Sequence, residues 1–83
     1  MKVTVKLFAV LGASLPAEAR RAVQVQEEVP PGTTVLDLIG RHRLPPEQCA
    51  LVLVNGGFVP PGARGRPLAE GDVLAIWPPV GGG

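Results

Sequence analysis

The last strand-like segment of the chain constrains the fold most strongly. Residues 73–77 read Val-Leu-Ala-Ile-Trp, a run without a polar side chain, and Pro78 and Pro79 follow at once. Because proline has no amide hydrogen, backbone pairing in a sheet should end at Trp77. An apolar run of this length is typical of a buried strand, and its burial is satisfied when it lies in the centre of a sheet. The fold therefore has to place this last strand in the centre of the sheet.

The N-terminal part predicts a hairpin of two strands. Residues 3–9 and 23–29 alternate apolar and polar side chains, which is the pattern of half-buried strands. Only Glu27 departs from this alternation. The segment between them contains glycine, serine and proline, which predicts a turn with a short helical piece at residues 16–20. Two strands joined in this way form an antiparallel hairpin.

The main helix is predicted over residues 35–42. Thr34 and, three residues later, Asp37 resemble a capping box at its start. Apolar side chains then recur at helical spacing, with His42 at the end of the same face. The helix has to end before residue 45, because Leu44 precedes a proline and such a residue disfavours helical geometry.

Two further strands and a loop complete the body. Residues 51–54 form a continuous apolar run, which predicts a strand buried on both faces. The sequence Asn55-Gly56-Gly57 is a strong turn signal and leads into a short strand at residues 58–59. Residues 60–67 are rich in proline and glycine and carry two arginines, so we expect an exposed surface loop there.

The order of elements is strand, strand, helix, strand, short strand, strand. In a chain of 83 residues the economical packing is one helix laid across one mixed sheet of four to five strands. The first and last strands then lie centrally, side by side and parallel. This α+β arrangement is the β-grasp (ubiquitin-like) fold, which we predict for residues 1–77, with residues 78–83 as a flexible C-terminal arm.

Charge and hydropathy exclude several classes of function. Eight basic and seven acidic residues give a net charge of +1, too little for binding driven by nucleic-acid phosphates. No apolar stretch approaches the roughly 18 residues that span a bilayer. The N-terminus begins a strand and has no signal-peptide pattern, so we expect a cytoplasmic protein.

The reactive residue types are sparse. Cys49 is the only cysteine, so neither a disulfide within the chain nor a cysteine-based metal site is expected. Cys49 is interpreted as a small core residue and His42, the only histidine, as a residue at the flank of the helix. No Ser/His/Asp set exists and no cluster has metal-ligand spacing. We therefore expect a protein that is not an enzyme, with no bound metal and no bound cofactor.

The last six residues predict an arm whose carboxylate is the working group. Pro78 and Pro79 stiffen its root, and extended residues 78–83 reach about 20 Å. Glycine has no Cβ, so the end of the arm fits a channel too narrow for side chains. Outward apolar residues near the root, Phe8 and Trp77, are candidates for a docking patch, with Arg64 nearby. Alternatively, both aromatic residues are part of the core. The tail can likewise be a disordered chain end that has no function.

Four segments resemble the MoaD/ThiS family of ubiquitin-like sulfur carriers. The most specific is the ending, residues 70–83, which joins a Gly-Asp turn, an apolar strand, two prolines, valine and a C-terminal diglycine. Residues 5–9, Val-Lys-Leu-Phe-Ala, resemble the first strand of the family. Residues 31–35 before the helix and 54–56 before the short strand also fit. The resemblance spans essentially the whole chain and implies the β-grasp fold.

The resemblance also implies a function. A ubiquitin-activating-type adenylyltransferase (MoeB/ThiF-like) uses ATP to adenylate the carboxylate of Gly83, and a persulfide sulfur donor then converts it to a thiocarboxylate. The carrier delivers this sulfur to an acceptor, such as a MoaE-like large synthase subunit. The carrier itself binds no cofactor, and it contacts neither nucleic acid nor membrane. The residues expected to bind partners are Phe8, Arg64, Trp77, Pro78, Pro79, Val80, Gly81 and Gly82.

Several functions stay open at this point. The Pro-Pro-Val ending and the chain length favour the MoaD-like branch, the small subunit of molybdopterin synthase, although Gly81 stands where that branch commonly has serine, threonine or alanine. Carriers for tungsten cofactors, thiamine thiazole, tRNA thiolation or cysteine synthesis share the ending. A protein modifier conjugated through Gly83 to lysine amines uses the same activated carboxylate. A plain interaction module with an idle tail is the remaining alternative.

Overall fold

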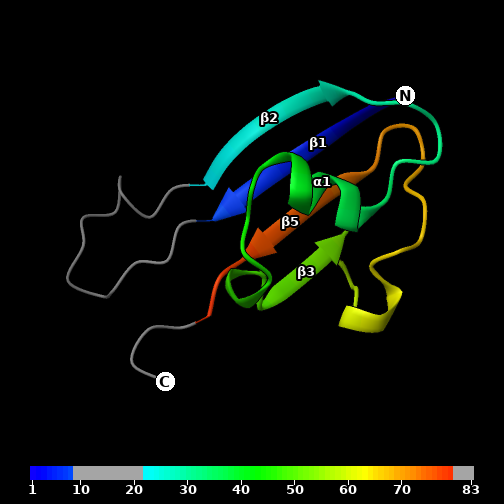
Figure 1. The fold of residues 1–83 in the computed structure, drawn as a ribbon. Coiled ribbons are helices and arrows are strands. Elements are labelled where there is room, and N and C mark those ends of the chain that lie inside the picture. Colours follow the sequence, from blue (N-terminus) through cyan, green and yellow to red (C-terminus); the bar gives the residue numbers. More distant parts are fainter. Residues whose placement is uncertain (9–21, 80–83) are drawn as a thin grey trace.

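One helix packs on one face of a five-stranded mixed sheet (Figure 1). The computed structural model describes residues 1–8 and 22–79. The strand order is β2-β1-β5-β3-β4. The strands are β1 (Lys2–Phe8), β2 (Ala22–Glu28), β3 (Leu51–Val54), β4 (Gly57–Phe58) and β5 (Val73–Trp77). The predicted β-grasp fold is confirmed, and the predicted helical piece at residues 16–20 lies outside the described residues.

The last strand occupies the centre of the sheet, as its composition requires. β5 pairs with β1 in parallel, from Thr4 opposite Val73 to Leu7 opposite Ile76, and with β3 antiparallel on its other side. Its middle residues, Leu74 to Ile76, are buried. Figure 1 shows β1 and β5 running in the same direction, so that the C-terminal ends of both strands lie side by side. The pairing with β3 ends at Trp77, whose carbonyl accepts a hydrogen bond from the amide of Ala50.

The helix α1 (Val35–Arg41) starts and stops where its sequence signals predict. The amide of Asp37 donates to the Thr34 hydroxyl at 3.0 Å, and the Thr34 amide donates to the Asp37 carboxylate at 2.9 Å, which completes the capping box. His42 is the C-terminal cap, one position beyond the helix. The apolar side of α1 lies in one core with residues from β1, β3 and β5. That core contains Val3, Val5, Val29, Val35, Leu38, Ile39, Cys49, Val52, Leu68, Leu74 and Ile76.

Two short 3₁₀ turns, η2 (Pro46–Gln48) and η3 (Pro61–Ala63), shape the loops around the sheet. The loop that contains η3 is tied to the start of α1. The amide of Leu36 donates to the carbonyl of Arg64, and the amide of Leu68 donates to the carbonyl of Thr33. The loop predicted as a surface segment is therefore a structural connection as well. No helix in the described part of the chain is long and apolar enough to cross a membrane.

Glu27 breaks the alternation of β2 because it contacts the helix. Its carboxylate forms a salt bridge with Nε of Arg41 at 2.9 Å and is paired with Nε2 of His42. Arg41 lies in the last turn of α1, where a positive side chain interacts favourably with the helix dipole, and His42 is the C-terminal cap. The off-pattern carboxylate thus fastens the end of α1 to the edge strand of the sheet.

Candidate functional site

The root of the C-terminal segment is marked by two stacked aromatic rings. Phe8 ends β1 and Trp77 ends β5, and because these strands are parallel neighbours the two side chains lie together. Their ring centroids are 4.1 Å apart and the ring planes differ by 7°. Since side chains alternate along a strand, both rings lie on the face of the sheet opposite to α1, while Leu7 and Ile76 point toward the helix. Phe8 and Trp77, two of the residues predicted to bind partners, thus lie together at the tail root, and their role in binding stays a prediction.

The same face carries a wider apolar surface, which we call the open-face patch. The register places Leu51 beside Trp77, Leu53 beside Ala75 and Phe58 beside Leu53. Leu51 is 39% exposed and Phe58 is 59% exposed. A single helix covers only the other face, so these side chains have no second layer above them in the described structure. The open-face patch consists of Phe8, Leu51, Leu53, Phe58 and Trp77, with the buried Ala75 between them.

Most residues of this patch are not marked by any local sequence pattern. The apolar run at residues 51–54 was expected to be buried on both faces, and that expectation is wrong, because Leu51 is exposed while its neighbour Val52 is fully buried. Phe58 lies in the edge strand β4, and its sequence neighbours predict only a turn and a short strand. The available signal was the short chain, which supplies one helix and hence one covered face.

A lysine supplies the positive charge of the open-face patch. Lys6 lies two residues before Phe8 in β1, so it projects from the same face. The register places Lys6 between Ala75 of β5 and Gln24 of β2. A cation next to an apolar patch suits a partner surface that is apolar with an acidic rim.

Arg64, predicted to be that cation, is instead buried. Only 7% of its surface is exposed. Nη1 donates to the carbonyl of Cys49 at 3.0 Å and Nε lies 3.5 Å from the carbonyl of Val59. The side chain therefore joins the η3 loop to the chain just before β3. Its predicted exposure is wrong, because a guanidinium can satisfy backbone carbonyls that the loop leaves unpaired.

A groove of about 220 Å³ lies beside the tail root. The ends of β1 and β5 form one wall through Leu7 and Ile76, and Leu44 and Pro45 form the other. Pro78 lines the same groove, and Pro79 after it is exposed. Since neither proline has an amide hydrogen, the chain leaves the sheet here. Residues Val80, Gly81, Gly82 and Gly83 lie outside the described residues.

Cys49 and His42 have structural positions. Burial raises the pKa of the Cys49 thiol, an effect that the nearby positive charge of Arg64 partly offsets. Its Sγ lies 3.6 Å from the carbonyl of Pro45, within the core. His42 is paired with Glu27. Within residues 1–8 and 22–79 no group of three or more histidine, cysteine, aspartate or glutamate side chains is placed to hold a metal ion.

Comparison with known proteins supports the same reading of the fold. The model of the ThiS family matches residues 13–83. Among solved structures the chain is similar to SAMP1 from Haloferax volcanii, with 33% sequence identity, a TM-score of 0.64 and complete coverage of both chains. Among curated proteins, none matches the sequence. The family match covers most of the chain and includes its C-terminal glycines, so the chain belongs to the ThiS family of ubiquitin-like proteins.

Proposed function

We propose that this protein is a sulfur carrier that works through the carboxylate of Gly83, and that its sulfur serves the synthesis of a molybdopterin-type cofactor. The observation that carries the proposal is the family match, which extends through residue 83. The stacked pair Phe8 and Trp77, directly before two prolines, supports it from the structure. Proline restricts the backbone, so Pro78 and Pro79 limit the conformations open to the start of the arm.

The chemistry of the proposal needs an activated carboxylate. A carboxylate is a poor electrophile until one oxygen becomes part of a good leaving group. An activating enzyme of the adenylyltransferase type supplies that group by joining the Gly83 carboxylate to AMP from ATP, with release of pyrophosphate. The terminal sulfur of a persulfide donor then attacks the acyl carbon as AMP leaves, which gives an acyl disulfide. A thiol of a partner protein attacks the donor's sulfur and breaks the S–S bond, so that the thiocarboxylate is released and the thiol and the donor are left joined as a disulfide. The carrier contributes no acid or base of its own, so ATP belongs to its partner.

Docking on the activating enzyme is assigned to the open-face patch and the tail root. Phe8 and Trp77 form the aromatic centre of that surface, and Lys6 lies beside them. Interfaces concentrate their binding energy in a few buried aromatic residues, and surrounding charges mainly set the rate of association. Pro78 and Pro79 lead from this surface to Val80, Gly81 and Gly82, which we propose enter the narrow channel of the enzyme.

Mass spectrometry of the protein purified from its native host tests the carrier function. A sulfur carrier should show a fraction whose mass has increased by the replacement of one oxygen by sulfur. The Gly82→Ala variant adds one methyl group in the proposed channel, so we expect loss of ATP-dependent adenylation with an unchanged fold. A variant that is adenylated at the wild-type rate would contradict the channel.

A second function uses the same acyl-adenylate. Conjugation of Gly83 to lysine amines would make the protein a modifier, and the reason to test it is that a lysine amine can attack the same acyl carbon with AMP as the leaving group. The mass spectra separate the two functions, because conjugation gives species heavier by whole proteins. If neither product is present under sulfur demand, the tail is idle and both functions are refuted.

Deletion of the gene in the native host identifies the acceptor pathway. We expect loss of molybdopterin-type cofactor, restored by the wild-type gene but not by a gene that lacks the last two glycine codons. A requirement for thiamine, loss of thiolated tRNA or a requirement for cysteine would assign the sulfur to another acceptor.

A further inference from the structure

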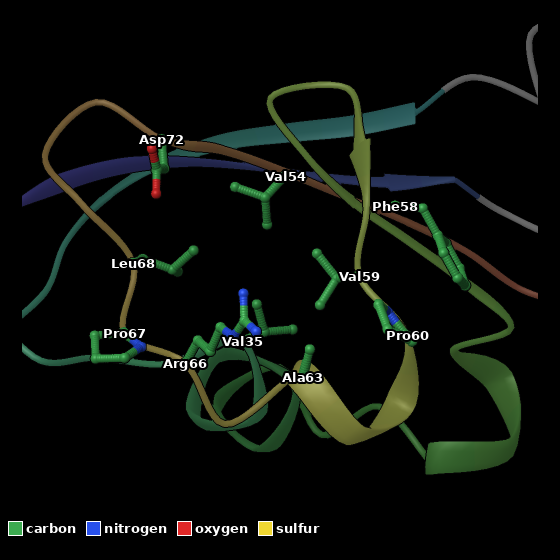
Figure 2. Close-up of a pocket in the computed structure, with 10 residues that line it drawn as sticks. All are labelled: Val35, Val54, Phe58, Val59, Pro60, Ala63, Arg66, Pro67, Leu68 and Asp72. Carbon is green, nitrogen blue, oxygen red and sulfur yellow. The ribbon is translucent and has the colours of Figure 1, made fainter.

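A second recognition surface lies at the opposite end of β5 from the tail root. It is a pocket of about 300 Å³ between the β3–β4 hairpin and the loop that leads from η3 to Leu68 (Figure 2). Apolar side chains form its walls: Val35 from α1, Val54 from β3, and Val59 and Leu68 from the loops. Asp72, directly before β5, lies at one side of the pocket. A pocket of this size and composition fits one medium-sized apolar side chain.

Arg66 brings a positive charge to the pocket, and its guanidinium is not paired with a carboxylate within the described residues. Figure 2 shows the guanidinium of Arg66 among the apolar walls. It makes no hydrogen bond or ion pair with any other residue that the structure describes. The carboxylate of Asp72 is already engaged, since it accepts hydrogen bonds of 2.8 Å from the side-chain amide of Asn55 and from the backbone amide of Ala69. An anionic group next to the bound apolar side chain would therefore find Arg66 available.

The backbone beside the pocket is open to a further strand. β4 is the edge of the sheet, and its amides alternate between pointing toward β3 and away from it. The amide of Val59 donates to the carbonyl of Val52, and Gly57 is opposite Val54 across the two-residue turn. Phe58 lies between these two inward positions, so its own N–H and C=O point away from β3. One residue of an extended peptide can pair with these two groups.

We propose that this surface docks an extended segment of a partner protein that carries one apolar side chain flanked by acidic residues. The peptide residue opposite Phe58 would point to the open face, and its neighbour would point into the pocket, because side chains alternate along a strand. Residues two positions from that neighbour lie about 7 Å away on the same side, within reach of Arg66. Backbone pairing, the apolar walls and Arg66 thus recognise three different properties of one peptide.

This proposal is independent of the function assigned to Gly83. The pocket reaches Asp72 and the tail root begins at Trp77, so about 16 Å of strand separates them at about 3.3 Å per residue. A partner held at the pocket leaves Phe8 and Trp77 uncovered, and of the open-face patch it contacts only Phe58. The surface can therefore hold one partner while another acts on the C-terminal residues.

The test uses the full chain and the probe peptide acetyl-Glu-Thr-Leu-Thr-Glu-amide, followed by two-dimensional ¹H–¹⁵N NMR. We expect shifts of the amide signals of Val54, Phe58, Arg66 and Leu68, with weak but saturable binding. Arg66→Gln should raise the Kd about two- to fivefold, the range expected for one exposed ion pair. Arg43→Gln removes an equal charge at an exposed position that does not line the pocket, and it should leave the Kd unchanged.

Three control peptides separate the contributions. Replacement of leucine by serine should abolish binding, and replacement of both glutamates by glutamine should reproduce the effect of Arg66→Gln. Methylation of the backbone nitrogens of both threonines removes the hydrogen-bond donors to Phe58 and should also abolish binding. Binding that survives N-methylation, shifts centred on Phe8 and Trp77, or no shift at millimolar peptide would each overturn the proposal.

Discussion

Both faces of the sheet carry apolar side chains, but these side chains are buried on one face and partly exposed on the other. On the face that α1 covers, Val52 and Leu74 are fully buried and contribute to the core. On the other face Leu51, the neighbour of Val52 in the same strand, is 39% exposed. An apolar side chain stabilises the fold only where a second layer removes it from water. On the uncovered face the same chemistry is available to a partner.

The largest difference in stability is expected when the same substitution, leucine to alanine, is made on each of the two faces. Leu74→Ala removes a fully buried side chain and should lower the free energy of unfolding by about 2–5 kcal/mol. Leu51→Ala removes the same atoms from an exposed position and should cost about 1 kcal/mol or less. Urea denaturation of both variants measures the difference. Equal losses would mean that the open face is covered in solution, for example by a second copy of the chain.

Two arginines, two positions apart, extend the comparison to charged residues. Arg64→Met leaves the buried carbonyl of Cys49 without its donor and should lower the free energy of unfolding by about 1–3 kcal/mol. Arg66→Met changes an exposed residue and should stay within about 0.5 kcal/mol of the wild type. Chemical denaturation gives both values. A stable Arg64→Met protein would show that water replaces the guanidinium without loss.

The binding role of the open face is tested through Phe8. Phe8→Ala should weaken the complex with the activating enzyme of the same host by about 1–3 kcal/mol, if the ring is an interface hot spot. Leu36→Ala is the control, because Leu36 is an exposed apolar residue on the outer side of α1, away from the open-face patch. Isothermal titration calorimetry measures both affinities. Equal weakening by both variants, or a collapse of the melting temperature of Phe8→Ala, would place the role of Phe8 in stability.

The smallest expected effect is a pH dependence of the folding stability, caused by the Cys49 thiol in the core on the covered face. Burial holds the pKa of the Cys49 thiol above its ordinary value of 9.0, so the folded state keeps a proton that the unfolded state loses. The thiol therefore contributes stability that is complete below that value and decreases as pH rises above it. Denaturation midpoints between neutral and alkaline pH should fall less steeply for Cys49→Ala than for the wild type. Parallel slopes would show that the thiol ionises equally in both states.

The local features of the fold could be predicted from the sequence. Period-two alternation gave β1 and β2 to within one residue at each end, and Thr34 with Asp37 set the start of α1. The apolar composition of residues 73–77 predicted a central strand, which β5 is. These features depend on neighbours within a few positions of the chain, so the amino-acid types alone specify them.

The candidate site could be predicted only in part. Phe8 and Trp77 were placed correctly because the parallel pairing of the first and last strands brings their ends together. Leu51, Leu53 and Phe58 join them through the register of β3 and β4, which no local pattern of these short strands reveals. The roles proposed for Val80 to Gly83 stay predictions, since these residues lie outside the described structure.

By itself the sequence determined the order of elements, their caps and turns, and the end of the sheet at Trp77 and Pro78, because each depends on local backbone preferences. Only the tertiary structure decided which apolar side chains are covered and which charges are buried. Glu27 lies in a strand but pairs with Arg41 of the helix, and Arg64 lies in a loop but is buried and donates to the carbonyl of Cys49. The reason is physical: burial and ion pairing depend on contacts between segments distant in the chain, and one helix can cover only one of the two faces.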